Sequence, residues 1–254
     1  METTYIEIDS PDKHLSDVLE EIPSNVILYK TLTGIGATYS EIKAQRHSII
    51  IEPNVPVIIG KCNSDKHKND NLLGVYEGVT TDRIIKYLGA SRGKYYKILT
   101  TPESFTKVKD AFLIFNGKIY NTCFLLIDEA HKTIKDVDYR SDIVLPMNDF
   151  FKFKGKALVS ATPLKFSDPR FEENGFSIIK IEPTYDYAKE IDIKPSTNIL
   201  REVWEEFGWM PFITGQDKDR PFFIFINSVG IIYSIISQLK LFDKSSVFCA
   251  PKSI

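Results

Sequence analysis

The feature of this chain that most restricts its fold is a series of short, almost uninterrupted apolar runs. The runs lie at 26–29, 48–51, 97–99, 124–127 and 157–160. Strands that are apolar on both sides belong in a sheet that is covered on both faces, and the stretches between these runs are long enough for crossover helices. The sequence therefore predicts an α/β fold with a parallel sheet.

Two regions flank this pattern. Leu15, Val18 and Leu19 recur at helical spacing within 12–21, which predicts a helix that ends before Pro23.

After about residue 182 the chain becomes polar and contains prolines, and apolar periodicity then resumes. We therefore predict a first domain over 1–182, a linker over 183–197 and the beginning of a second α/β domain over 198–254. The elements expected there are a helix at 198–204, a strand at 221–226, a helix at 229–241 and a strand at 246–249. They are too few to close a usual α/β domain, so we expect the chain to be truncated or completed from elsewhere.

Composition excludes several kinds of protein. The formal net charge is -2, so a nucleic-acid partner would have to meet a local basic patch. Cys62, Cys123 and Cys249 form no Cys-x-x-Cys pair, which argues against a disulfide framework or a zinc site. No signal peptide is recognisable, and no run approaches the roughly 20 apolar residues that span a bilayer. These features predict a cytoplasmic protein.

The most informative polar residues follow the apolar run at 124–127. Asp128, Glu129 and His131 come directly after it, where the carboxyl ends of parallel strands form ligand sites. Asp128 is suited to hold the magnesium of a nucleotide, and Glu129 to orient or deprotonate an attacking water. The alternative is that the two acids only cap the following helix.

These residues, Asp-Glu-Ala-His, match the second motif of the superfamily 2 DEAD/DEAH-box helicases, and the chain resembles that family of RecA-like P-loop ATPases. Further segments match the family's motifs in the family's order. They are the phosphate loop at 33–38, a backbone-contacting motif at 100–104, the Ser-Ala-Thr motif at 160–163 and the fourth motif at 223–228. The resemblance implies two RecA-like domains, ATP and Mg²⁺ as cofactors, and DNA or RNA as the partner.

The resemblance also implies a nucleotide site with one departure from the family. The residues that would surround the nucleotide are Thr33, Gly34, Ile35, Gly36, Ala37, Thr38 and Tyr39. Thr38 and Asp128 would hold the metal. Ala37, however, stands where the family carries the lysine that reaches the β- and γ-phosphates.

Three interpretations of this departure remain open. Another lysine, such as Lys30, Lys43 or Lys61, reaches the phosphates from elsewhere in the sequence. The site binds nucleotide but hydrolyses it poorly. Or the site binds no nucleotide, and Gly34 and Gly36 serve only a tight turn between strand and helix.

The nucleic-acid contacts implied by the resemblance are Thr100, Thr101, Ser104 and, more loosely, Pro53. Their alternative role is local, with Thr101 as a helix N-cap followed by Pro102 at the first helical position. A stretch rich in Lys and Arg could add phosphate contacts, and a solvated charged face explains it equally well. Its members are Lys61, Lys66, His67, Lys68, Arg83, Lys86, Arg92, Lys94 and Lys97, with Tyr95 and Tyr96 available for stacking.

Function follows as an expectation from these matches. Ser160 and Thr162 would couple hydrolysis to domain movement, and Asp128, Glu129 and His131 would complete the catalytic set. The expected activity is an ATP-dependent nucleic-acid helicase or translocase. We expect it to be weak or absent in the isolated chain, because Ala37 replaces the lysine and the sequence given ends before the family's sixth motif, which carries the arginine finger. The alternatives are a non-catalytic module that binds nucleotide or nucleic acid, and a motor subunit whose protein partner supplies the missing charge.

Overall fold

The computed structural model describes most of the first part of the chain and little of the rest. The described residues are 1–135, 145–162, 168–187, 195, 197–198, 201–202, 225–226, 228–238, 240, 242 and 247. The chain divides into two compact units, Met1–Ala188 and Lys189–Ile254. In the second unit the described element is helix α12 (Val229–Gln238), which lies within the helix predicted at 229–241. Most residues of the other elements predicted after residue 197, and most of the linker, lie outside the described residues.

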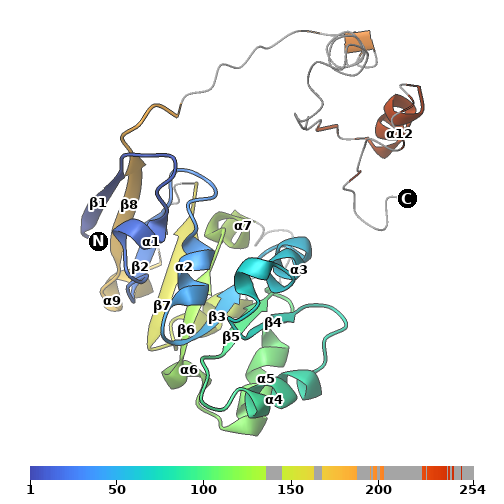
Figure 1. Ribbon diagram of the computed structural model, residues 1–254. Coiled ribbons are helices and arrows are strands. Elements are labelled where there is room, and N and C mark those ends of the chain that lie inside the picture. Colours follow the sequence, from blue (N-terminus) through green and yellow to red (C-terminus); the bar gives the residue numbers. More distant parts are fainter. Residues whose placement is uncertain are drawn as a thin grey trace. The chain divides into compact units, whose positions relative to one another are not determined.

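The first unit is built on one parallel sheet of eight strands in the order β1-β8-β2-β7-β6-β3-β5-β4 (Figure 1). The strands are β1 (Thr3–Ile8), β2 (Val26–Tyr29), β3 (His47–Ile51), β4 (Leu72–Val75), β5 (Lys97–Thr100), β6 (Cys123–Ile127), β7 (Gly155–Ser160) and β8 (Ser177–Pro183). Every pairing is parallel. The predicted α/β class with a parallel sheet is confirmed.

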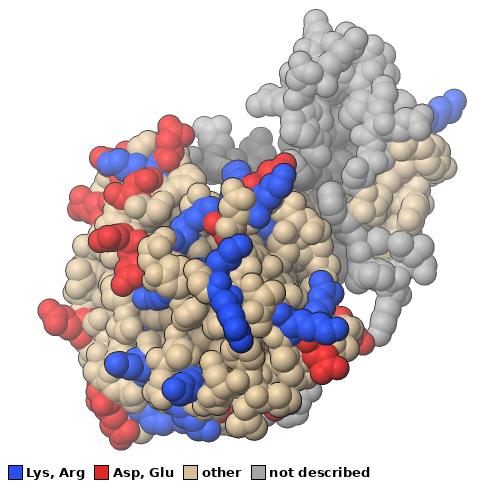
Figure 2. All heavy atoms as spheres, turned by 60° about the horizontal axis from the view of Figure 1, so that its bottom comes forward, with Lys and Arg blue, Asp and Glu red and all other residues tan. Residues whose placement is uncertain are grey.

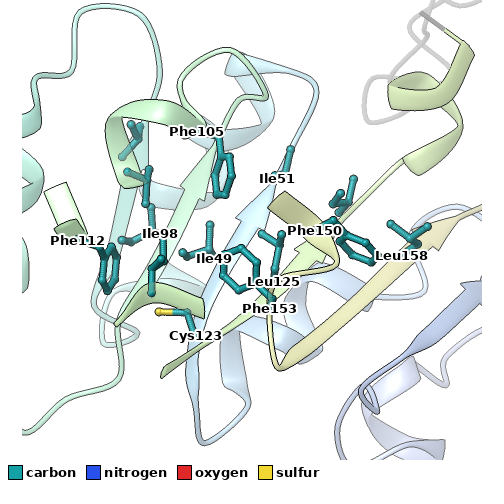
Figure 3. Packing of buried hydrophobic residues seen from close by; sticks show 14 of the residues in the cluster. Ile49, Ile51, Ile98, Phe105, Phe112, Cys123, Leu125, Phe150, Phe153 and Leu158 are labelled. Carbon is teal, nitrogen blue, oxygen red and sulfur yellow. The ribbon is translucent and has the colours of Figure 1, made fainter. Parts of the chain in front are cut away.

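Helices cover both faces of this sheet, as crossovers between parallel strands require. The helices of the first unit are α1 (Leu15–Val18), α2 (Ala37–Lys43), α3 (Val55–Cys62), α4 (Thr81–Ala90), α5 (Phe105–Phe115), α6 (Ile119–Thr122), α7 (Ala130–Lys135), α8 (Leu145–Phe150) and α9 (Arg170–Glu173), with a short 3-10 turn at Asp65–His67. One apolar cluster joins the sheet to α1, α2 and α3. The other joins it to α4, α5, α6 and α8, and Figure 3 shows its Phe and Ile side chains packed against the strands.

The five strands predicted in the first domain are all present, and three edge or near-edge strands of its sheet were missed. The runs at 26–29, 48–51, 97–99, 124–127 and 157–160 correspond to β2, β3, β5, β6 and β7. The first strand, β1, lies at an edge and exposes much of its sequence Thr-Thr-Tyr-Ile-Glu-Ile, so it lacks a continuous apolar run. Strand β4, at the other edge, is short and contains Gly74, and β8 lies next to β1. The helix predicted at 12–21 is only the single turn α1.

A buried lysine fixes helix α2 to the sheet. Lys97 begins β5, and its Nζ donates hydrogen bonds to the backbone oxygens of Glu41 (2.7 Å) and Ala44 (2.8 Å) and to Oγ of Ser48 (3.0 Å). Burial lowers the pKa of Lys97 to about 8, although the nearby Glu41 carboxylate opposes this shift. The expectation that Lys97 belongs to a surface basic patch is wrong, because its side chain lies under the end of α2.

This burial predicts an unusual pH dependence of stability. Lys97 is charged in both the folded and unfolded states below about pH 8, so the whole penalty of burying its charge is present there. Between about pH 8 and pH 10.5 only the unfolded chain keeps the proton, so the contribution of Lys97 to the free energy of unfolding rises with pH, by about 3 kcal/mol. Urea unfolding of the wild type and of Lys97→Met across this range should show the rise in the wild type alone. Parallel curves for the two proteins would contradict the prediction.

Candidate functional site

Polar side chains gather where four neighbouring strands of the sheet end. Lys30 follows β2, Ser160 ends β7, Asp128 follows β6 and Glu52 follows β3. The parallel register brings all four strand ends to one edge of the sheet, because β2, β7, β6 and β3 are consecutive neighbours. Three of these side chains are charged, and all four residues are buried.

Asp128 is at the centre of this group. Its Oδ2 accepts a 2.5 Å hydrogen bond from the hydroxyl of Thr38, which comes from α2, 90 residues earlier in the chain. Its Oδ1 accepts a 2.8 Å bond from the backbone N–H of Glu129 and lies 3.0 Å from Nζ of Lys30. Burial alone would raise the pKa of Asp128, but the charge of Lys30 and the Thr38 hydrogen bond outweigh it, and the pKa is lowered. Asp128 is therefore an ionised carboxylate in a buried position.

Lys30 is the buried cation of the cluster. Its side chain is 8% exposed, and its Nζ lies 3.0 Å from Oδ1 of Asp128 and 2.7 Å from Oε1 of Glu129. Burial by itself would lower the pKa of Lys30. The charge of Asp128 and the hydrogen bonds to both acids have the larger effect, so the pKa of Lys30 is raised. Lys30 thus neutralises part of the charge of two adjacent carboxylates.

Glu129 and His131 connect this cluster to strand β7. Glu129 adopts φ of +50°, a left-handed conformation that is costly for a residue with a Cβ atom. Its Oε2 lies 3.3 Å from Nδ1 of His131, which is 3.2 Å from Oγ of Ser160. The Ser160 hydroxyl donates to the backbone oxygen of Thr162 (2.7 Å) and accepts from its N–H (3.1 Å). The structure therefore brings together the predicted catalytic residues of two distant motifs.

A third acid, Glu52, was not predicted as part of this site. Its Oε1 lies 3.3 Å from Oγ1 of Thr38, and its carboxylate forms an ion pair with Lys61. Burial and the negative charge of Asp128 raise the pKa of Glu52, and Lys61 opposes the shift. The sequence does contain a signal for it, since Glu52 directly follows the apolar run of β3, as Asp128 follows that of β6.

The predicted phosphate loop lies between β2 and α2. Gly34 and Gly36 have φ of +82° and +87°, a region that residues with a Cβ atom rarely adopt. Thr33 and Gly34 are exposed, whereas Ile35 and Ala37 are buried in the apolar cluster beneath α2.

Tyr39, also predicted to contact nucleotide, points elsewhere. It is exposed, and its ring lies 5.4 Å from that of His67, with Nζ of Lys43 5.5 Å from its centre. Lys43 in turn binds the carboxylate of Asp70. Of the three lysines considered as substitutes for the missing one, Lys43 is therefore engaged away from Asp128, Lys61 pairs with Glu52, and Lys30 contacts Asp128 and Glu129 directly.

The predicted nucleic-acid contacts are less accessible than expected. The side chains of Thr100, Thr101 and Ser104 are buried. Thr101 Oγ1 accepts from the N–H of Ser104, and helix α5 begins only at Phe105, with Ser104 as N-cap. The local role of Thr101 is therefore present, but it caps a turn that precedes the helix. Pro53 is half-buried.

The basic stretch is only partly exposed. Within it Lys97 is buried, and His67 is buried against Asp70 with 2.8 Å between Nδ1 and Oδ2. Tyr96 stacks on His47 at 4.3 Å, and Tyr95 remains exposed. On the face drawn in Figure 2, basic and acidic side chains are interspersed among uncharged ones.

The donors of the cluster suit a hard cation that is shared with a ligand. Thr38 and Asp128 offer hydroxyl and carboxylate oxygens, the atoms that Mg²⁺ prefers, and Mg²⁺ is usually held by one or two protein groups together with phosphate oxygens. Among the described residues there is no group of three or more His, Cys, Asp and Glu placed to hold a metal by themselves. The described helices also include none with the length and apolarity needed to cross a membrane.

Comparisons with known proteins give similarities to solved helicase structures. The chain is similar to a hypothetical ATP-dependent RNA helicase from Sulfolobus tokodaii (14% identity, TM-score 0.43, 85% of this chain and 63% of that chain covered). It is also similar to the DUF1998 helicase MrfA (13% identity, TM-score 0.49, 87% of this chain and 36% of that chain covered). A DEAD box protein from Methanococcus jannaschii is similar as well (18% identity, TM-score 0.41, 85% of this chain and 59% of that chain covered). The chain thus spans less than two thirds of the length of each. No protein family matches the sequence, and no curated protein does.

Proposed function

We propose that the first unit binds a magnesium nucleoside triphosphate, with ATP as the expected nucleotide, at the cluster formed by Lys30, Thr38, Asp128 and Glu129. The observation that carries this proposal is the 2.5 Å contact between the Thr38 hydroxyl and the Asp128 carboxylate at the carboxyl ends of the parallel strands. The hydroxyl directly follows a glycine turn, and the carboxylate beside it is buried and ionised. This arrangement suits a metal-bound triphosphate.

Each residue of the cluster has a role in this proposal. Thr38 and Asp128 would hold Mg²⁺, which when bound neutralises charge that develops on the phosphate oxygens. Glu129 would orient or deprotonate a water, and its carboxylate is held ready by His131 and Lys30. His131 and Ser160 would link the position of Glu129 to strand β7.

The binding site is tested by titration calorimetry with Mg²⁺ and a non-hydrolysable ATP analogue. We expect saturable binding by the wild type that is lost when EDTA removes the metal. Asp128→Asn keeps the size of the side chain but removes its charge, so affinity should fall by about 10- to 100-fold, the effect of losing one or two charge-assisted contacts. Asp149→Asn is a matched control, because Asp149 is also buried and ion-paired but binds Lys109 and Lys152. Equal affinities for the wild type and Asp128→Asn would contradict the proposed site.

The activity that we propose for this site is hydrolysis that drives a helicase or translocase on DNA or RNA. Its support is the position of Glu129 beside Asp128 and the order in which the sequence motifs follow that of the helicases. A non-catalytic binding module is the second candidate, and the specific observation in its favour is Ala37. Phosphate release measured with and without single-stranded DNA or RNA separates the two. Turnover stimulated by the polymer supports the motor, and saturable nucleotide binding without any turnover supports the module.

A further inference from the structure

The cluster at the strand ends has an excess of negative charge that a triphosphate would increase. Asp128, Glu129 and Glu52 contribute three acids, and the two nearby cations are Lys30 and Lys61. Ala37 contributes a methyl group buried among apolar side chains. Any nucleotide bound here therefore requires a cation from another position to meet its terminal phosphates.

Lys30 is placed to supply that cation. Asp128 uses its two oxygens differently, with Oδ2 on the Thr38 hydroxyl and Oδ1 on Nζ of Lys30. The ammonium group therefore lies on the same carboxylate that, with Thr38, offers the oxygens for a metal. It also touches Glu129, the acid expected beside the attacking water. The ammonium group of Lys61 is paired with Glu52 instead, which also lies beside Thr38.

The backbone of Lys30 is fixed by hydrogen bonds, and its charge lies at the end of a flexible side chain. Its N–H donates to the backbone oxygen of Ser160 at 3.0 Å, and its own backbone oxygen accepts from the N–H of Leu32. Lysine carries its charge on a four-carbon stem, so Nζ can shift by several ångströms without a change in the backbone. Entry of a metal beside Asp128 would compete with Lys30 for the carboxylate and release the ammonium toward the phosphates.

We propose that Lys30, at the end of β2, performs the phosphate-binding task that the phosphate loop assigns to position 37, and that it exchanges its carboxylate partners for the terminal phosphates of a nucleoside triphosphate. This inference rests on the proposed nucleotide site and identifies the residue that makes the site work without the usual lysine. It assigns a phosphate-binding role to Lys30 and leaves Lys43 and Lys61 outside that role.

The first test measures the affinity of Lys30→Gln for the magnesium complex of a non-hydrolysable ATP analogue. Gln keeps a hydrogen-bond donor for the two carboxylates but removes the charge, and circular dichroism establishes that the variant is folded. We expect affinity to fall by about 10- to 100-fold, as for the loss of a charge-assisted phosphate contact. Lys43→Gln, which removes an exposed lysine bound to Asp70, should keep the wild-type affinity.

The double variant Lys30→Gln with Ala37→Lys distinguishes a phosphate ligand from a counter-ion. If Lys30 binds the terminal phosphates in place of a lysine at position 37, then Ala37→Lys should restore nucleotide affinity to within about threefold of the wild type. A loss that Ala37→Lys does not relieve would mean that Lys30 serves the two acids only, and would overturn the inference. Unchanged affinity of Lys30→Gln would overturn it as well while leaving the nucleotide site intact, whereas absence of binding by the wild type would refute the site itself.

A second measurement uses the wild type and so does not depend on how a variant folds. An acyl-phosphate derivative of ATP carries a mixed anhydride at its terminal phosphate. An amine beside that phosphate attacks the acyl carbon, forms an amide, loses a proton and releases ATP as the carbon–oxygen bond breaks. Peptide mass spectrometry should find the acyl group on Lys30, with protection by excess ATP. Acylation of Lys61 in place of Lys30, or of neither lysine, would contradict the inference.

Discussion

Lys30→Met should lower the free energy of unfolding by about 3–5 kcal/mol, the usual result of removing one partner from a buried ion pair. Methionine fills a similar volume, so the loss comes from charge and not from a cavity. Asp128 and Glu129 would be left without the ammonium that lies 3.0 Å and 2.7 Å from them. Equilibrium unfolding in urea near neutral pH measures the change.

An exposed ion pair gives the control for this prediction. Lys43 lies 2.7 Å from Asp70, but its side chain is 39% exposed, compared with 8% for Lys30. Lys43→Met should therefore cost about 1 kcal/mol or less. Equal losses for the two variants would show that burial does not strengthen the Lys30 contacts.

Phe112→Ala should also lower the free energy of unfolding by about 3–5 kcal/mol, through lost burial and the cavity left behind. Phe112 lies on the inner face of α5, is fully buried and packs edge-on against Tyr96 at 6.0 Å (Figure 3). Thermal or urea unfolding measures the loss.

The next residue on the same helix provides the matched control. Leu113 is 75% exposed, so Leu113→Ala removes little buried area and introduces a good helix former. Its effect should stay within about 0.5 kcal/mol, as for ordinary surface substitutions. A large loss of unfolding free energy for Leu113→Ala would contradict the exposure of this helix face.

The core of the first unit could be predicted from local patterns because burial on both faces demands apolar residues throughout a strand. Strands β2, β3, β5, β6 and β7 carry that signal, and they are five consecutive strands inside the sheet, with the edge strand β4 beyond β5. Strands β1 and β4 lacked it, because an edge strand has a neighbour on one side only and tolerates polar residues and glycine.

The candidate site was only partly predictable. The adjacent acids after β6, the glycine turn after β2 and the hydroxyl of Thr38 were visible as motifs. Their meeting was expected from the family resemblance alone, because no local pattern encodes it: the 2.5 Å contact between Thr38 and Asp128 depends on the order of strands that are far apart in the chain. The position of Glu52 beside Thr38 depends on the same strand order and was not expected.

The sequence by itself determined the parallel α/β class and the strand ends at which the chemistry lies, because the hydrophobic pattern is a local property of each segment. Only the tertiary structure decided the fate of individual lysines. Lys30, Lys61 and Lys97 are equivalent charges in the sequence, but the fold aims one at two acids, one at Glu52 and one at the carbonyl oxygens that end α2. The physical reason is that a long, flexible lysine side chain pairs with groups on the strands and helices that lie beside it in the fold. Most of those groups are far from the lysine in the sequence.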